Sequence, residues 1–223
     1  MLLLLWSGEF SLTSAIVYIL SSLAVIFLSM PIHEFAHGYV GYKLGDPTPR
    51  YQGRLTLNPF AHIDYVGALG ILLIGVGGAK PVQVNMYNFR KPKRDMALVA
   101  AAGPLANIIS AFICMLLSNL LVAVTNSVRI YYPLVFFYFI ALINVRLAVF
   151  NLIPLPPLDG SRILGLFLPD RIYYKIMQYE RYIYFILLIL VFSGVLGGLI
   201  NNVTDSIING LDTVASLPFR FLG

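Results

Sequence analysis

Two histidines and a glutamate stand together near the beginning of the chain, in the sequence HEFAH at residues 33–37. His33 and His37 are four residues apart, so in a helix both imidazoles lie on one face, one turn apart, where they can bind a single metal ion. Glu34 follows the first histidine; in motifs of this form it is not a ligand but the base that takes a proton from water. The pattern therefore predicts one catalytic Zn2+ ion and a hydrolytic reaction. The alternative is a chance grouping of two core histidines and a glutamate.

A catalytic zinc ion usually has three protein ligands, so this motif is one ligand short. Asp159 stands in NLIPLPPLDG, residues 151–160, where three prolines exclude a regular helix. Irregular backbone at membrane depth is tolerated where it lines a cavity in the protein. We expect Asp159 to be the third ligand, with His62 and Asp64 as the alternatives. The competing interpretation of Asp159 is a turn residue before Gly160.

The composition places these residues in a membrane protein. The chain has 223 residues, of which 59% are hydrophobic and 11% are charged, and its mean hydropathy is +0.83. Soluble domains carry about 25% charged residues. Apolar runs of roughly 18 residues or more indicate membrane spans. Four segments can cross a bilayer, at about 12–44, 97–124, 131–152 and 182–200.

We therefore expect an all-α polytopic membrane protein with about four to six membrane helices, organised as a single domain over residues 1–223. Its core would occupy about residues 12–168, with accessory helices at about 169–223. Residues 66–79 are apolar but too short to span, and their five glycines favour a re-entrant or interfacial segment. The tail from Val203 onward is mixed, so we expect it to lie on the membrane surface or to form a further span.

Lysine and arginine are unevenly distributed between the loops. Eight lie between the first and second spans and four between the third and fourth, whereas only Arg129 and Arg220 lie on the opposite side. Positive charge prefers the cytoplasm, so we expect HEFAH and Asp159 to lie toward the cytoplasmic face. The isoelectric point of about 9.3 then reflects basic loops at a membrane and not a nucleic-acid partner. The basic cluster at 88–95 would contact anionic lipids.

Three motifs together resemble a known family. HEFAHG at 33–38, AAGPLAN at 101–107 and NLIPLPPLDG at 151–160 follow the order and spacing of the site-2 protease family of intramembrane zinc metalloproteases. The resemblance covers about residues 20–168. GRLTLNPFAHID and GGAKPVQVN further resemble its small bacterial-type branch, which lacks an appended PDZ or CBS domain.

The resemblance implies that His33, His37 and Asp159 bind zinc. It also implies that Glu34 is the catalytic base and that Asn151 contacts the substrate or the oxyanion. The implied activity is cleavage of transmembrane protein segments, with a substrate helix and the lipid bilayer of a prokaryotic cell membrane as partners. The alternative is a zinc-binding transporter or scaffold without hydrolytic activity. Such a protein needs ligands but no base, so the glutamate favours the protease. The oligomeric state is not predicted by the sequence.

Further candidates surround these motifs. Residues 50–58, RYQGRLTLN, alternate partly between polar and β-favouring residues, which predicts a short β-like loop at the membrane surface. Its edge could pair with an unwound substrate, so Arg54 and Leu55 are candidate substrate-binding residues; the alternative is a loop packed on the headgroups. Asn107 would form a polar contact near the metal or bond to a neighbouring helix. Arg146 lies within the third span, so we expect it to pair with a carboxylate or with backbone carbonyls.

Overall fold

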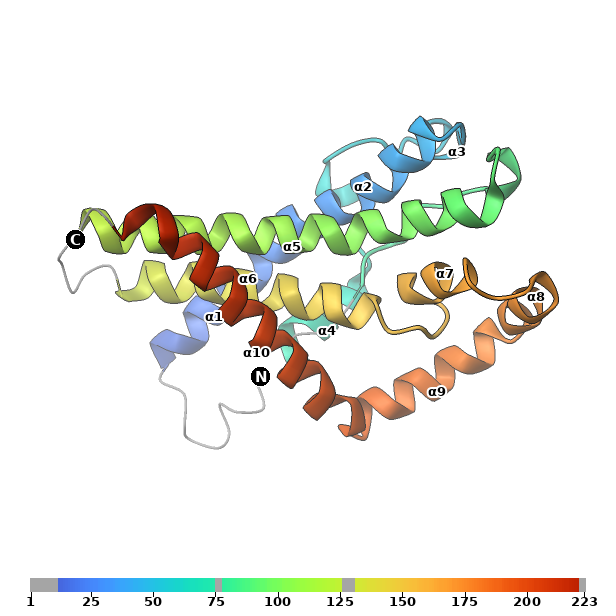
Figure 1. Cartoon of the computed structure of the whole chain (residues 1–223). Coiled ribbons are helices and arrows are strands. Elements are labelled where there is room, and N and C mark those ends of the chain that lie inside the picture. Colours follow the sequence, from blue (N-terminus) through green and yellow to red (C-terminus); the bar gives the residue numbers. More distant parts are fainter. Residues whose placement is uncertain (1–11, 75–77, 126–130, 221–223) are drawn as a thin grey trace.

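The computed structural model describes residues 12–74, 78–125 and 131–220 of the chain. Every regular element within these ranges is a helix (Figure 1), which confirms the expected all-α architecture. Helix α5 is central to the arrangement. It packs along α6 and also contacts α2, α7 and α10.

Three helices are long and apolar enough to cross a membrane. They are the rod Leu12–Lys43, which comprises α1 (Leu12–Ala24), a π-helical turn (Val25–Ser29) and α2 (Met30–Lys43); α5 (Pro92–Val124); and α6 (Tyr131–Asn151). A fourth crossing exists if the bent pair α9 (Glu180–Phe192) and α10 (Val195–Ser216) is one span. The number found in the described residues is thus three or four, at or just below the lower end of the expected range. The chain is a multi-pass membrane protein.

The last crossing is not the straight helix that the apolar run at 182–200 predicts. Helices α9 and α10 meet at an angle of 79°. Gly194 lies between them with φ of +74°, a conformation that other residues rarely adopt, and it ends α9 before the apolar run is complete. Residues 203–216 of the tail belong to α10, which crosses α5 and α6 in Figure 1, and residues 221–223 lie outside the described part of the chain.

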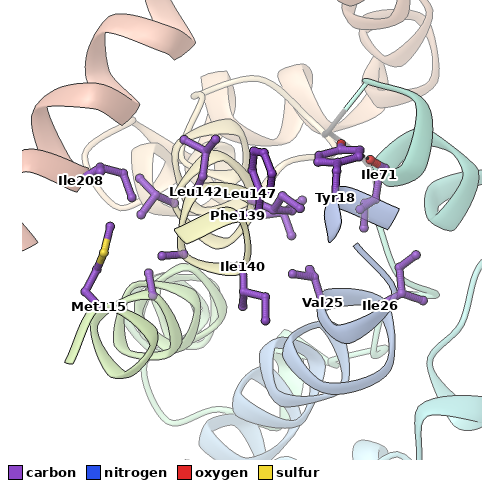
Figure 2. Packing of buried hydrophobic residues seen from close by; sticks show 14 of the residues in the cluster. Tyr18, Val25, Ile26, Ile71, Met115, Phe139, Ile140, Leu142, Leu147 and Ile208 are labelled. Carbon is purple, nitrogen blue, oxygen red and sulfur yellow. Dashed lines mark hydrogen bonds between the residues drawn. The ribbon is translucent and has the colours of Figure 1, made fainter. Parts of the chain in front are cut away.

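The apolar core forms where α6 meets α1, α5 and α10. Figure 2 shows Phe139 and Ile140 of α6 between side chains of the neighbouring helices. Tyr18 packs edge-on against Phe139, with ring centroids 5.5 Å apart, and its hydroxyl donates to the carbonyl of Ile71 at 3.0 Å. Burying the tyrosine with its hydroxyl satisfied ties α4 (Tyr65–Ile74) to the bundle. At ten residues α4 is too short to span, as the sequence predicts.

The π-helical turn precedes Pro31. The N–H of Met30 donates to the carbonyl of Val25, five residues back, where an α-helix would use a partner four residues back. Pro31 has no N–H to offer, and its ring crowds the carbonyl four residues earlier, so a wider turn relieves the clash. Ser29 in this turn accepts a hydrogen bond from the Asn144 amide of α6 at 3.0 Å. The turn therefore also holds the rod against α6.

The prediction of a β-like loop at residues 50–58 is wrong. Its first residues belong to α3 (Thr48–Tyr51), and the rest is turn and coil. Pro49 at the start of this helical turn presets a helical φ, and Gly53 with φ of +66° reverses the chain, so the N–H of Arg54 donates back to the carbonyl of Pro49 at 2.8 Å. Proline and glycine thus override a partial alternation of side chains.

The remaining helical elements among the described residues are short. They are α7 (Asp159–Gly165), α8 (Asp170–Gln178) and three 3-10 turns at Pro59–Ala61, Met86–Asn88 and Leu217–Phe219, the last of which follows α10. At the start of α5, the Lys93 ammonium lies 2.6 Å from the Asp170 carboxylate and above the ring of Tyr173 in α8. The two basic loop regions of the sequence therefore meet at the same end of the bundle (Figure 1).

Candidate metal centre

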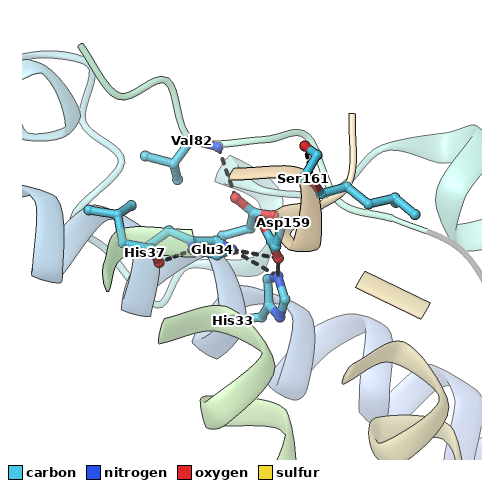
Figure 3. A network of polar contacts seen from close by, with 8 residues as sticks. His33, Glu34, His37, Val82, Asp159 and Ser161 are labelled. Atoms are coloured by element: carbon cyan, nitrogen blue, oxygen red, sulfur yellow. Dashed lines mark hydrogen bonds and ion pairs between the residues drawn. The ribbon is translucent and has the colours of Figure 1, made fainter. Parts of the chain in front are cut away.

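Three side chains from two distant parts of the sequence converge on one point. The Nε2 atoms of His33 and His37, one turn apart on α2, are 3.0 Å from each other. The Oδ2 atom of Asp159 lies 3.5 Å from the first of these nitrogens and 3.3 Å from the second (Figure 3). Among the described residues, this is the one group of three histidine, cysteine or acidic side chains whose donor atoms are close enough to share a metal ion.

The hydrogen bonding of His37 leaves the correct nitrogen free for a metal. Its Nδ1 atom lies 2.7 Å from the carbonyl of Val99 on α5. A carbonyl only accepts hydrogen bonds, so in the neutral ring Nδ1 carries the proton and Nε2 presents its lone pair to the site. A backbone carbonyl behind a histidine ligand is a common arrangement in metal sites, because it fixes the orientation of the ring.

Asp159 is the first residue of α7 and follows the proline-rich segment. Burial by itself raises the pKa of this carboxyl group, but the adjacent imidazoles of His37 and His33 outweigh burial and hold the pKa of Asp159 well below its usual range. The carboxylate is therefore ionised where it meets the histidines. The next residue, Gly160, lets the start of α7 lie close to the backbone of Leu152, because a Cβ there would lie 2.2 Å from the carbonyl oxygen of Leu152.

Helix α5 passes close to the Nε2 atoms of the two histidines at Gly103. A Cβ atom on this residue would lie 2.3 Å from Nε2 of His37 and 2.5 Å from Nε2 of His33, far inside contact distance. In the sequence this glycine stands in the AAGPLAN motif at residues 101–107. Its position against the metal-facing nitrogens depends on the tertiary packing of α2 on α5, which no local pattern reveals.

We expect Gly103→Ala to reduce zinc binding, because the added methyl group would occupy the space at the two Nε2 atoms that the metal needs. The measurement is zinc per purified protein after dialysis against a weak chelator. Gly210→Ala is the matched control, since it also adds a methyl to a helical glycine but meets no atom within 4 Å. Full zinc occupancy in the Gly103 variant would contradict the close packing described here.

Glu34 is buried beside the histidines. Its Oε2 atom accepts a hydrogen bond from the backbone N–H of Val82 at 2.8 Å (Figure 3). Val82 belongs to a segment without regular secondary structure, residues 80–85, that precedes the Met86–Asn88 turn. The Glu34 carboxylate, which belongs to α2, is thus held by a separate segment of the protein.

A cavity of about 1060 Å³ contains the candidate site. Besides His33, Glu34, His37 and Asp159, it is lined by both asparagines that the sequence singled out, Asn107 and Asn151. Asn107 is buried, and its Oδ1 atom has no partner among the described residues. The structure therefore brings together six of the predicted site residues.

The other candidate ligands are not part of the three-residue cluster. His62 is buried, with Nε2 at 2.9 Å from the carbonyl of Thr56. Asp64 lines the cavity, but its carboxylate accepts the N–H of Gly67. Neither Arg54 nor Leu55 is among the residues that line the cavity. Arg54 instead donates to the carbonyl of Ala61.

Arg146 also has a partner different from those expected. Its Nη2 atom donates to the amide oxygen of Asn201 in α10 at 3.1 Å. No carboxylate within the described ranges forms an ion pair with it. This contact joins α6 to α10 and does not involve His33, His37 or Asp159.

A model of peptidase family M50 matches residues 21–194. The chain belongs to peptidase family M50. This confirms the resemblance to site-2 proteases that the three motifs indicated. The chain is 40% identical over 190 residues to the Bacillus subtilis protein named "Putative zinc metalloprotease YwhC", and the alignment covers 82% of this chain and 87% of that relative.

Two further relatives of this M50 peptidase are longer. "Putative zinc metalloprotease Rip2" of Mycolicibacterium smegmatis is 31% identical over 140 residues, which are 60% of this chain and 51% of the relative. "Zinc metalloprotease MJ0392" of Methanocaldococcus jannaschii is 30% identical over 147 residues, which are 66% of this chain and 34% of the relative. No solved structure matches the chain significantly.

Proposed function

We propose that this protein is a zinc-dependent endopeptidase that cuts transmembrane segments of other proteins. The observation that carries the proposal is the convergence of His33, His37 and Asp159 in one cavity with the Glu34 carboxylate. Two ligands on one helix and a third from another element leave a position open, which distinguishes a catalytic zinc site from a structural one. The metal named for the relatives is the one that this donor set suits.

The donor set fits zinc in charge as well as in geometry. Two neutral imidazoles and one carboxylate partly neutralise a dication, which lowers the free energy needed to bury it. When bound, zinc would act as a Lewis acid and make water a stronger nucleophile at neutral pH. His33, His37 and Asp159 would hold it, and the Val99 carbonyl would keep the ring of His37 in position.

Glu34 would be the general base. Its carboxylate would take a proton from the attacking water, and that proton is then available to the amine that leaves when the peptide C–N bond breaks. The N–H of Val82 fixes one carboxylate oxygen, so the side chain cannot turn freely. Asn107 and Asn151 would contact the peptide backbone, since an amide can both donate to a carbonyl and accept from an N–H. Arg54 and Leu55 lie outside the cavity lining and are not part of the proposal.

The walls of the cavity suit an apolar polypeptide. Helices α4 and α9 both contribute apolar side chains to its lining, namely Val66, Leu69, Leu73, Tyr184, Leu187, Leu188 and Val191. A transmembrane segment presents such residues to its surroundings. Helix α9 lies in the part of the chain that the sequence assigned to accessory helices, so this part also contributes to the site.

The proposal is tested with the purified protein in liposomes that contain a labelled single-helix membrane protein. We expect cleavage fragments with zinc present, none after chelation, and their return when zinc is restored. A zinc transporter would instead move zinc into the liposomes and leave the labelled helix intact. Zinc uptake without fragments would therefore overturn the proposal.

We also propose that the site faces the cytoplasm. The basic loop regions meet at the end of the bundle that holds α2, α7 and α8, and positive charge favours the cytoplasmic side. Tyr87 at this end is 80% exposed, and Val124 at the far end of α5 is 65% exposed.

Single cysteines placed at these two positions report the orientation, in a background that carries Cys114→Ala. A membrane-impermeant thiol reagent added to intact cells should label the Val124→Cys variant and spare the Tyr87→Cys variant. Inverted vesicles should give the opposite pattern. Labelling of the Tyr87→Cys variant in intact cells would reverse the proposed orientation.

A further inference from the structure

The segment at residues 80–85 forms part of the cavity wall, and hydrogen bonds hold it to other parts of the chain. Three of its backbone N–H groups donate outside the segment: Lys80 to the carbonyl of His62 (2.7 Å), Val82 to the carboxylate of Glu34 (2.8 Å) and Asn85 to the carboxylate of Asp46 (2.7 Å). The hydrogen bond to Glu34 thus lies between two others, at Lys80 and at Asn85. The acceptor of the hydrogen bond at Asn85 is the buried carboxylate of Asp46.

Asp46 is fully buried just beyond the end of α2. Its Oδ2 atom accepts the N–H of Asn85. Its Oδ1 atom accepts three further hydrogen bonds, from the N–H and the hydroxyl of Thr48 at 3.1 and 2.6 Å and from the amide of Asn88 at 2.6 Å. Burial raises the pKa of Asp46, but the hydrogen bonds from Thr48, Asn88 and Asn85 outweigh it and lower this pKa below its usual value.

We infer that Asp46 is a positioning residue for Glu34, which it reaches through the segment at 80–85. The carboxylate fixes the Asn85 end, so that the N–H of Val82, three residues earlier, stays directed at Glu34. The inference rests on the proposed role of Glu34 as the base. If the anchor is released, Val82 moves and the Glu34 carboxylate loses the contact that fixes its rotation. A misplacement of about 1 Å can lower a rate by about 10²-fold.

The substitution Asp46→Asn removes the anchor selectively. An amide keeps one acceptor oxygen and replaces the other with an NH2 group. Three donors surround Oδ1, so the amide oxygen should remain there and the NH2 group should face the N–H of Asn85. That places two donors against each other and releases the segment. We expect kcat for cleavage to fall by about 10- to 100-fold, with KM changed by about twofold or less and zinc retained.

Thr48→Val is the matched control on the same carboxylate. It removes the hydroxyl that donates to Oδ1 but leaves the contact between Oδ2 and Asn85 intact. We expect this variant to keep a kcat within about threefold of the original protein, since its segment at 80–85 stays anchored. An equal fall in kcat for both variants would mean that Asp46 acts only by stabilising its own loop.

A double-mutant cycle tests whether the effect passes through Val82. Val82→Pro removes the N–H that donates to Glu34, at a position outside any regular helix or strand. Once that N–H is gone, Asp46→Asn should lower kcat by no more than about a further twofold. If the two substitutions instead multiply, Asp46 acts by a route that does not include Glu34, and the inference fails.

Amide hydrogen exchange separates this inference from the proposed function. In the Asp46→Asn protein, exchange at residues 82–88 should accelerate while exchange in α5 and α6 is unchanged, whether or not the protein cuts peptides. Faster exchange with no proteolysis even in the original protein would refute the proposed function and leave the anchor in place. Unchanged exchange at residues 82–88 would overturn the anchor itself.

Discussion

Glu34→Gln should abolish measurable cleavage while zinc remains bound. Glutamine preserves the shape of the side chain but cannot take a proton from water, and a general base contributes about 10² to 10⁴ to the rate. The proposed zinc donors on His33, His37 and Asp159 are not altered by this change. Fragment yield from a labelled membrane helix and zinc per protein, measured on the same preparation, give the two expected results.

The zinc measurement decides the role of this residue. If the Glu34→Gln protein lost its metal, Glu34 would be a ligand or a support for one, and the base would have to be found elsewhere. Val82→Pro is a useful comparison, because it removes the hydrogen bond to Glu34 but does not change the Glu34 carboxylate chemically. It should retain measurable cleavage where Glu34→Gln has none.

Asp159→Ala should lose both zinc and activity. Without its carboxylate the site has only the two imidazoles of α2, which carry no negative charge to offset the dication. The variant should therefore release zinc to a weak chelator that does not remove it from the original protein. Elemental analysis of the dialysed protein measures this directly, and fragment yield should fall with the zinc content.

His62→Ala is the control for this prediction. His62 was an alternative third ligand, and it too is buried. Its ring contacts the carbonyl of Thr56 and is not part of the group formed by His33, His37 and Asp159. This variant should keep its zinc even if its stability is lower. Full zinc in Asp159→Ala together with loss of zinc in His62→Ala would move the third ligand to the first loop.

The sequence predicted the parts of the site that depend on local chemistry. The spacing of His33 and His37 is a property of one helix, and the prolines before Asp159 determine that the chain turns there. The meeting of these two motifs followed from topology, because both lie at the same end of their spans. The sequence favoured Asp159 as the third ligand over His62 and Asp64, and of these three the tertiary structure places only Asp159 beside the histidines.

What the sequence did not predict depends on contacts between distant segments. The alternation at 50–58 indicated a strand, but Pro49 and Gly53 determine the backbone there. The closeness of Gly103 to the histidines arises only when α5 packs on α2. Asp46 gave no signal at all, since its partners Asn85 and Asn88 lie about forty residues further along the chain.

The π-helical turn at Val25–Ser29 has a consequence for how this protein can change in evolution. A turn of this kind is equivalent to one extra residue in an α-helix, and each residue turns the following helix by about 100°. In the observed register, α1 packs on α6 while α2 packs on α5. Loss of one residue from the turn would leave a regular rod, yet it would rotate His33 and His37 away from Asp159. Among related sequences, the number of residues between Tyr18 and His33 should therefore stay constant even where the residues themselves differ.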